Sequence, residues 1–473
     1  MDTLEKAVDF GEKLGADFVE ARFEDLTLRS LQKINENWKD ITAKTRSGIG
    51  VVCYYKGGSG YSFTASKSDK DIQEAVERAF KIAKASVPAV SIKLGFDNQP
   101  PVKSTGSDTF TVKEHPKHHS IDEKTELVNR AMDTAKEHGE NISTITGLYG
   151  ELYGTKLFTN SDRSIIDWEF RVVDLVCYVV SKTKEGNMVN SLERSGGTAG
   201  FELFSKEGST PEDIGRKAGK GAKAQLVARA CPAGQFRALV DNVLAGTLAH
   251  ESFGHLSEAD FIVTSSSPLT GKIGTKLGSE HATIADNGVP DIEKHGGIWL
   301  PFDDQGTRSG ETTMLDKGTV THYLHSRGTA KYLKQKPTGN CRAVHFGFMP
   351  IPRMTNTYFK PGDLTEEEAL ELLGTGVYAI ESQGGQVQGD GSFLFKARSG
   401  YWVENGEKKY PLREVSLSGN ILDLLGRVEG ATKDFKIRGG YFGGCGKSGQ
   451  YPLPTGLGGP KLVIDSVTFG GKA

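Results

Sequence analysis

Cysteine is scarce in this sequence. The 473 residues include five cysteines, and no two of them form a Cys-x-x-Cys pair. A disulfide framework and a ribbon-type zinc site both need clustered cysteines, so this spacing excludes them. The five lie far apart along the chain: Cys53, Cys177, Cys231, Cys341 and Cys445.

Long apolar runs and an excess of charge of either sign are also missing. No apolar stretch approaches the roughly 20 residues of a membrane-spanning helix, and the N-terminus has the pattern of an amphipathic helix rather than a signal peptide. The 58 Lys and Arg nearly balance the 60 Asp and Glu, for a formal charge of −2. Such a chain has no general attraction to nucleic acid or an anionic membrane. We therefore expect a cytoplasmic protein with neither as a partner.

Glycine, by contrast, is abundant. The chain has 59 glycines, and they are denser from residue 231 onward, whereas an average protein contains about 7% glycine. Without a collagen-like period, this density indicates many tight turns between short strands. The C-terminal half is therefore expected to be rich in β-structure.

The N-terminal half alternates helical and strand patterns. Helices are expected to begin after Ser68, Ser120 and Thr210, because these residue types cap helix N-termini. The first helix is expected to bury Ile82, and the third to run to about residue 230. Strands are expected over residues 142–149, 151–159 and 164–181.

After Cys231 the pattern changes to short segments separated by Asn-Gly and Gly-Gly pairs. A strand over Phe236–Val240 leads into a helix from Asp241 to about Phe253, and one further helix over Glu366–Leu373 interrupts the strands. The sequence thus predicts an α+β protein in two domains, with a boundary between residues 225 and 235. The N-terminal domain, residues 1–230, is expected to be mixed α/β. The C-terminal domain, residues 231–473, is expected to be β-rich and mainly antiparallel, and it carries the helix after Asp241.

That helix contains the strongest motif for chemistry, His250-Glu251-Ser252-Phe253-Gly254-His255. In the H-E-x-x-H motif of zinc peptidases the histidines are four residues apart, about 40° around an ideal helix, and reach one metal ion. A spacing of five gives about 140°, which is too divergent for a shared ion. A π-type turn or a break at Gly254 would bring His255 beside His250. Glu251 would then lie beside the metal, placed to take a proton from water.

A catalytic zinc usually has three protein ligands and one open position. From the residues alone, three candidates for the third ligand stay open. Glu258 and Asp260 are close in sequence, and Cys445 lies among glycines that would let the backbone approach a metal. Lys447 would help to keep the thiol of Cys445 ionised.

Taken together, the motifs resemble the TldD/PmbA family, specifically its TldD branch of zinc metallopeptidases. The resemblance covers nearly the whole chain, and its segments follow the family's order: Leu14–Arg22, His250–His255, Phe302–Gly306, Thr338–Asn340, Arg353–Thr357 and Cys445–Gln450.

The resemblance implies a peptidase whose zinc ion is held by His250, His255 and Cys445, with Glu251 as the general base. It also implies hydrolysis of unfolded or extended peptides. Family members are dimers, so the chain is expected to pair with itself or with a PmbA-type (TldE) paralogue that lacks the metal motif. The alternative is a non-catalytic peptide- or protein-binding subunit, of the gyrase-modulator type, with a structural zinc. A hydrolase of non-peptide amides fits the same residues.

Two further expectations concern the substrate. The oxyanion of peptide hydrolysis needs a donor besides the metal, and His325, His345 and Arg353 are the candidates. Gln305 stands where the family commonly has an acidic residue. If its side chain assists binding, the substrate preference is expected to shift.

Overall fold

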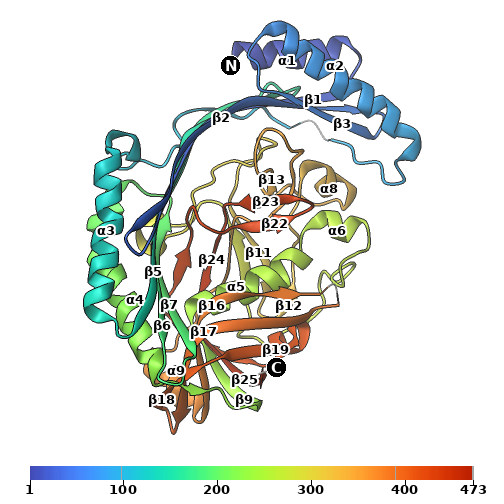
Figure 1. The fold of residues 1–473 in the computed structure, drawn as a ribbon. Helices are drawn as coiled ribbons and strands as arrows, with labels where there is room; N and C mark the ends of the chain where they lie inside the picture. Colours follow the sequence, from blue (N-terminus) through green and yellow to red (C-terminus); the bar gives the residue numbers. More distant parts are fainter. Residues whose placement is uncertain (97–98, 389, 471–473) are drawn as a thin grey trace.

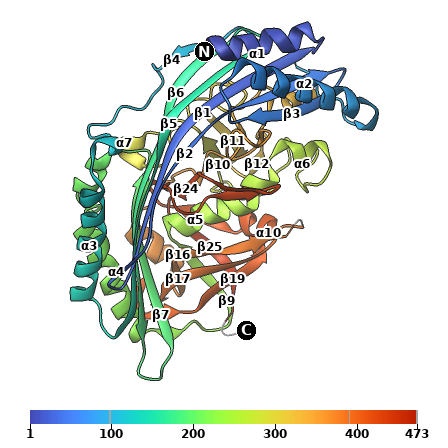
Figure 2. The ribbon, with the colours of Figure 1, turned by 45° about the horizontal axis from the view of Figure 1, so that its top comes forward.

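The computed structural model describes residues 1–96, 99–388 and 390–470. A long curved sheet from the N-terminal half arches over the C-terminal half of the chain (Figure 1). Four helices cover the outer, convex face of this sheet, two near each end (Figures 1 and 2). They are α1 (Asp2–Lys13), α2 (Asp69–Ser86), α3 (Ile121–His138) and α4 (Pro211–Leu226).

The N-terminal sheet has seven strands in the order β3-β2-β1-β5-β6-β4, with β7 also paired to β6. Four of them are long, and they pair antiparallel over nearly their whole lengths. The bounds are β1 Phe18–Ile34, β2 Asn37–Tyr55, β3 Gly58–Thr64, β4 Lys103–Thr105, β5 Ile142–Asn160, β6 Ile165–Lys182 and β7 Met188–Gly197.

Side-chain caps begin three of the outer helices where the sequence predicts. The hydroxyls of Ser68, Ser120 and Thr210 each accept a hydrogen bond from the backbone N–H three residues later. The expectation for Ile82 is wrong, because its side chain is 47% exposed. The smaller Ala83 is fully buried on the inner face of α2 instead.

The expected break between two strands near residue 150 is also wrong, since β5 is one continuous strand. Gly150 serves close packing here rather than a turn. A Cβ atom at this position would lie 2.2 Å from Cδ1 of Tyr441. The missing side chain therefore lets a residue of the C-terminal half pack directly on the sheet.

Two large sheets form the C-terminal half. A six-stranded sheet has the order β12-β11-β10-β15-β24-β21, and an eight-stranded sheet the order β16-β9-β25-β19-β17-β18-β8, with β20 paired to β25. Strands β16 and β17 also pair, which closes part of the second sheet on itself. The six-stranded sheet contains β10 Ile284–Asn287, β11 Glu311–Asp316, β12 Thr319–Val320, β15 Asn356–Phe359, β21 Lys436–Arg438 and β24 Gly456–Gly459.

The eight-stranded sheet is mainly antiparallel and begins with a segment expected to be helical. The predicted helix after Thr210 ends early, at Leu226, because Arg229–Ala230 pairs as β8 with β18. The bounds are β8 Arg229–Ala230, β9 Gly234–Val240, β16 Gly376–Val387, β17 Ser392–Glu404, β18 Glu407–Arg413, β19 Val415–Asn420, β20 Val428–Ala431 and β25 Leu462–Gly470. Two hairpins complete the strands: β13 Cys341–Arg342 with β14 Ile351–Pro352, and β22 Cys445–Lys447 with β23 Gln450–Leu453.

The helix α5 (Asn242–Leu248) and the π-helical turn η4 (Ala249–Gly254) run through the core of the C-terminal half (Figure 1). They contact strands of both large sheets. A Cβ atom on Gly246 would lie 2.1 Å from the backbone nitrogen of Gly458, so α5 packs directly against β24. The predicted α+β class, with a β-rich second half that carries this helix, is confirmed.

Helix α9 has the predicted bounds, Glu366–Leu373. The expectation that it alone interrupts the strands is wrong. The described residues contain four shorter helices: α6 Ala259–Val263, α7 Ile292–His295, α8 Arg327–Tyr332 and α10 Ile421–Gly426. Each has six residues or fewer, which is too short for a helical period to appear in the sequence.

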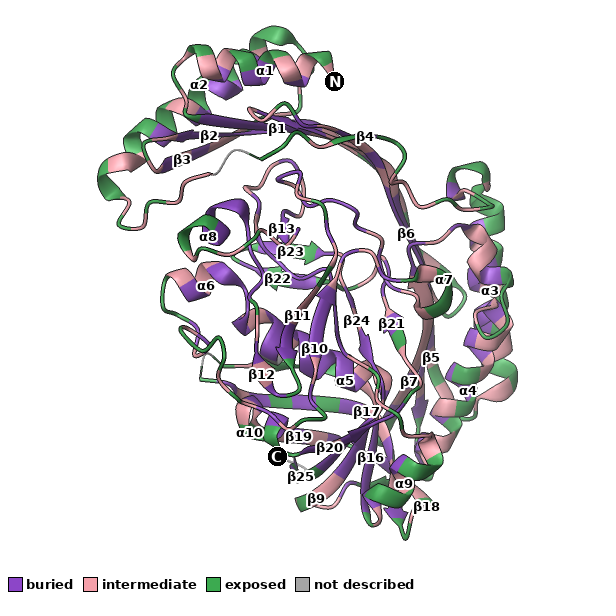
Figure 3. Ribbon diagram, turned by 180° about the vertical axis from the view of Figure 1, so that it is seen from behind, coloured by how far each residue is buried: buried purple, intermediate pink, exposed green. Residues whose placement is uncertain are grey.

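The two halves share a buried interface on the concave face of the long sheet, where Figure 3 shows mostly buried and intermediate residues. Leu26, Phe158 and Trp168 of the sheet pack with Ile298 and Phe302 in one apolar cluster. No helix among the described residues is long and apolar enough to cross a membrane.

Candidate metal centre

The histidine motif lies where α5 changes into the π-helical turn η4. Asp241 caps the start of α5 by accepting a hydrogen bond from the backbone N–H of Leu244 at 2.8 Å. In a π-helix the hydrogen bonds join residues five apart. His250 and His255 therefore lie on the same side, with ring centroids 5.3 Å apart. The predicted widening of the helix is confirmed.

Gly254 lets this turn pack closely against a neighbour, because it lacks a side chain. A Cβ atom there would lie 2.1 Å from Sδ of Met354, which is fully buried. The turn therefore packs in direct contact with Met354, two residues before β15.

Cys445 comes to the two histidines from the hairpin of β22 and β23, 190 positions along the chain from His255. The potential ligand atoms of His250, His255 and Cys445 all lie within 4.8 Å of one another. Sγ of Cys445 is 3.4 Å from Nε2 of His255. Zinc bonds of about 2.1 Å to nitrogen and 2.3 Å to sulfur, at a tetrahedral angle, would separate these atoms by about 3.6 Å. The spacing suits one shared ion.

The electrostatics of the cluster keep its cysteine ionised. Burial raises the pKa of the Cys445 thiol, but the two histidines lower it overall, to about 5. The pKa of His255 is raised to about 11: burial lowers it, whereas Glu258 and Cys445 outweigh this. The thiolate is the form of cysteine that binds zinc, whereas His255 has to lose a proton when an ion binds.

His250 supplies a direct test of the fit. It is 2% exposed, and its Nδ1 has no hydrogen-bond partner among the described residues. An unpaired buried nitrogen is costly. One thiolate and two imidazoles also form a usual donor set for zinc. The residues present therefore fit the metal that the sequence predicts.

Glu251 borders this cluster on its solvent side. Its side chain is 38% exposed, and its Oε2 lies 4.0 Å from Nε2 of His255, the same nitrogen that faces Cys445. The carboxylate is thus adjacent to the ligand atoms and accessible to water. This arrangement can support proton transfer beside a metal ion.

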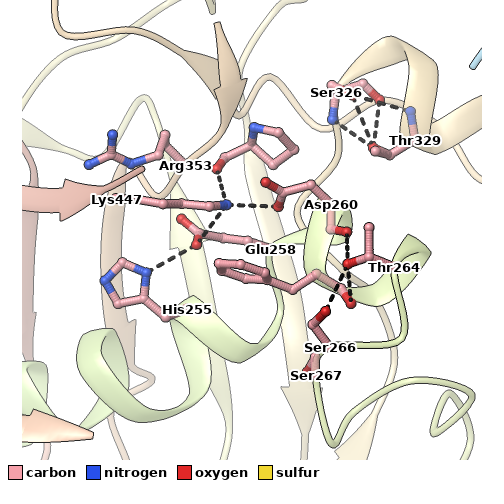
Figure 4. Close-up of polar contacts among 12 residues, drawn as sticks. His255, Glu258, Asp260, Thr264, Ser266, Ser267, Ser326, Thr329, Arg353 and Lys447 are labelled. Carbon is pink, nitrogen blue, oxygen red and sulfur yellow. Dashed lines mark hydrogen bonds and ion pairs between the residues drawn. The ribbon is translucent and has the colours of Figure 1, made fainter. Parts of the chain in front are cut away.

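The two other candidates for the third ligand lie outside the cluster. Oε2 of Glu258 lies 3.0 Å from Nδ1 of His255, on the far side of the ring from Cys445. Oδ1 of Asp260 lies 2.7 Å from Nζ of Lys447 (Figure 4). The expectation that Lys447 keeps the thiol ionised is wrong, because its ammonium group contacts the two carboxylates and the histidines lower the thiol pKa.

The oxyanion candidates are engaged elsewhere. Both ring nitrogens of His325 lie within hydrogen-bond distance of side chains, Thr329 and Gln335. His345 accepts a hydrogen bond from a backbone N–H two residues later. Arg353 is fully buried and donates to the carbonyl of Cys445 at 2.8 Å. Its role in supporting the hairpin had no local signal in the sequence.

Gln305 lies in the interface between the two halves. It is 4% exposed, and its Nε2 donates to Glu20 of β1 at 3.2 Å. An acidic residue at this position would place two carboxylates together. The departure at Gln305 therefore bears on how the halves pack.

The fold and the cluster define an α+β protein with a buried histidine–cysteine site of metal-ligand type. Three family models match the chain, described as PmbA/TldA metallopeptidase domain 1, central domain and C-terminal domain; they cover residues 19–83, 114–226 and 233–471. The chain belongs to the PmbA/TldD family, which confirms the resemblance in the sequence.

Similar proteins carry metalloprotease names. A metalloprotease of Methanothermobacter thermautotrophicus is 35% identical over 434 residues, 92% of this chain and 91% of that protein. The zinc metalloprotease TldD homolog of Saccharolobus solfataricus is 26% identical, over 98% of this chain and 99% of its own length. These names support a metallopeptidase.

Solved structures share the fold. TldE from Thermococcus kodakarensis matches with a TM-score of 0.77 at 17% identity, over 99% of this chain and 100% of its own. A Thermotoga maritima protein described as a candidate modulator of a DNA gyrase matches with a TM-score of 0.80 at 22% identity, over 99% of both chains. At these identities, the matches bear on the fold.

Proposed function

We propose that this protein is a zinc-dependent peptidase that hydrolyses unfolded or extended peptides. His250, His255 and Cys445 would hold the zinc ion, and Glu251 would act as the general base. The observation that carries the proposal is the convergence of these three ligand atoms within 4.8 Å, with an accessible carboxylate 4.0 Å from one of them. The zinc metalloprotease name of a full-length relative supports the choice of metal.

Zinc, when bound, supplies Lewis-acid chemistry: it polarises a carbonyl group and makes water more acidic. The chain's own residues do the rest. Glu251 accepts a proton from the attacking water and returns it to the leaving amine, because its carboxylate borders the cluster and reaches solvent. Burial of Cys445 and His250 keeps bulk water from their side of the site.

An extended peptide suits the surroundings of Cys445. The hairpin of β22 and β23 is a two-stranded sheet, and neither edge pairs with a further strand among the described residues, although Arg353 already occupies the carbonyl of Cys445. A substrate strand added to an edge is bound through its backbone whatever its sequence. This mode would select unfolded segments, because a folded protein does not present a free strand.

We also propose that the chain acts as a dimer in the cytoplasm, with itself or with a TldE-type paralogue, and binds neither nucleic acid nor membranes. The similarity to a solved TldE structure supports this kind of partner. We further propose that residues 1–230 and 231–473 are separate domains, since the family models change between residues 226 and 233.

The test is cleavage of an unstructured peptide by the purified protein. We expect cleavage to stop when a chelator removes the metal and to return when Zn²⁺ is added back. A protein that binds zinc and peptide but never cleaves would contradict the enzyme and favour the binding subunit with a structural zinc. Cleavage confined to non-peptide amides would contradict the substrate class.

A further inference from the structure

A chain of charged groups, of which Glu258 and Lys447 are buried, lies behind the metal-ligand cluster and joins its two halves. It runs from His255 to Glu258, from Glu258 to Lys447 and from Lys447 to Asp260 (Figure 4). Glu258 follows His255 on the same segment, whereas Lys447 belongs to the strand of Cys445. The chain therefore connects the segment that carries the histidines with the strand that carries the cysteine.

The first contact fixes the ring of His255. Oε2 of Glu258 lies 3.0 Å from Nδ1 of His255. When a metal ion takes the place of the proton on Nε2, a carboxylate at this nitrogen keeps the other proton on Nδ1 and fixes the direction of the Nε2 lone pair. Nε2 is the nitrogen 3.4 Å from Sγ of Cys445. Glu258 thus orients the ring of His255 so that Nε2 faces the shared metal position.

The second contact fixes the hairpin of Cys445. Nζ of Lys447 lies 3.1 Å from Glu258, 2.7 Å from Asp260 and 3.0 Å from the carbonyl oxygen of Pro352. The ammonium group donates hydrogen bonds to Asp260 and to the carbonyl of Pro352, and it forms an ion pair with Glu258. The position of Lys447 is thereby determined, and with it that of Cys445 two residues earlier.

General stability does not account for this arrangement. The side chain of Glu258 is fully buried and that of Lys447 is 4% exposed, and one oxygen of Glu258 has no hydrogen-bond partner in the described part of the chain. Burying two charges costs several kcal/mol each, and apolar residues of similar size are often as stable. The geometry instead matches the carboxylate–histidine contacts that orient metal ligands.

We propose that Glu258 and Lys447 are positioning residues that hold His255 and Cys445 at metal-binding distance before the metal arrives. The inference rests on the proposed function, since it assumes that this cluster binds zinc. Glu258 sets the ring of His255, and Lys447 ties the cysteine strand to Glu258. Arg353 supports the same strand through the carbonyl of Cys445.

The experiment measures Zn²⁺ affinity by competition with a chelating dye, together with the visible spectrum of Co²⁺ bound in place of zinc. We expect Glu258→Gln to weaken zinc binding by about 10- to 100-fold and to change the Co²⁺ spectrum. Lys447→Met is expected to act in the same direction, and Lys447→Arg to recover part of the loss. The double variant should lose less than the two single losses combined, because both act through one link.

Two matched variants control for the loss of a buried or largely buried charge. Glu151 is fully buried and paired with Lys124 and Arg29, and Lys461 pairs with two carboxylates. Glu151→Gln and Lys461→Met remove the same kinds of group in other parts of the fold. Both should leave zinc affinity and the Co²⁺ spectrum unchanged.

Circular dichroism identifies variants that fold. If Glu258→Gln does not fold, the comparison of Lys447→Arg with Lys447→Met is the test. Zinc affinity within twofold of the wild type in folded Glu258→Gln or Lys447→Met, with an unchanged Co²⁺ spectrum, would overturn the inference alone. A wild-type protein that binds no zinc would overturn the proposed function and the inference with it.

Discussion

At the scale of single residues, Glu251 and Glu258 show how position assigns different roles to the same side chain. Glu258 is fully buried and contacts Nδ1 of His255, on the side of the ring away from Cys445. The side chain of Glu251 is 38% exposed and lies near Nε2 of His255, the nitrogen that faces Cys445. The first can orient a ligand, whereas the second can exchange protons with water.

Replacing Glu251 should therefore separate metal binding from hydrolysis. We expect Glu251→Gln to keep its zinc and to lower kcat by about 10²- to 10⁴-fold, the usual contribution of a general base. Peptide turnover and zinc content measured on the same sample check this. Full activity of this variant would contradict the role of Glu251.

At the scale of elements, the π-helical turn η4 decides whether the site exists. The motif supplies the right residues at a spacing that an ideal helix cannot use. The turn corrects the spacing, and Gly254 lets it pack against Met354. The motif, the π-helical turn and the contact of Gly254 with Met354 thus act together to place the two histidines side by side.

Gly254→Ala tests the contact between the turn and Met354, because the added methyl group would overlap Sδ of this fully buried methionine. We expect a loss of about 1–3 kcal/mol in the free energy of unfolding and weaker zinc binding. In Gly254→Ala/Met354→Ala the methyl group has room, so this double variant should cost less than the sum of the two single changes. Urea unfolding of the four proteins measures the coupling, and additive costs would argue against it.

Local signals explain which elements could be predicted from the sequence. Ser120 and Glu123 form the expected capping box, and Gly254 indicated the widened helix, because both depend on neighbours within a turn. The continuity of β5 through Gly150 depends instead on pairing with β1, a strand far away in the sequence. The same holds for Cys445. From the residues alone, Cys445, Glu258 and Asp260 were equal candidates for the third metal ligand, and only the resemblance to a family favoured Cys445.

At the scale of the whole molecule, buried charges join the long sheet to the C-terminal half. Asp304 contacts Lys156 of β5 at 3.1 Å and Arg22 of β1 at 3.4 Å. Burial raises the pKa of Asp304, but these two cations lower it overall, to about 2. Its charge therefore stabilises the folded state.

The sign of the pH dependence follows. The folded pKa is below the unfolded value of 3.8, so the stabilisation is fully present above about pH 4 and is lost as the pH falls toward 2. Asp304→Asn should lower the free energy of unfolding by about 2 kcal/mol or more at pH 7. The difference in unfolding free energy between the variant and the wild type should become smaller below pH 4. Urea unfolding at several pH values measures it. A gap that stays constant between pH 7 and pH 2 would contradict the assignment.

The metal content of the purified protein, with and without Cys445, tests the central claim most directly. The account predicts stoichiometric zinc in the wild-type protein and its loss in Cys445→Ala, with the fold retained by circular dichroism. Wild-type protein without zinc, or a folded Cys445→Ala variant that binds zinc as tightly as the wild type, would contradict it.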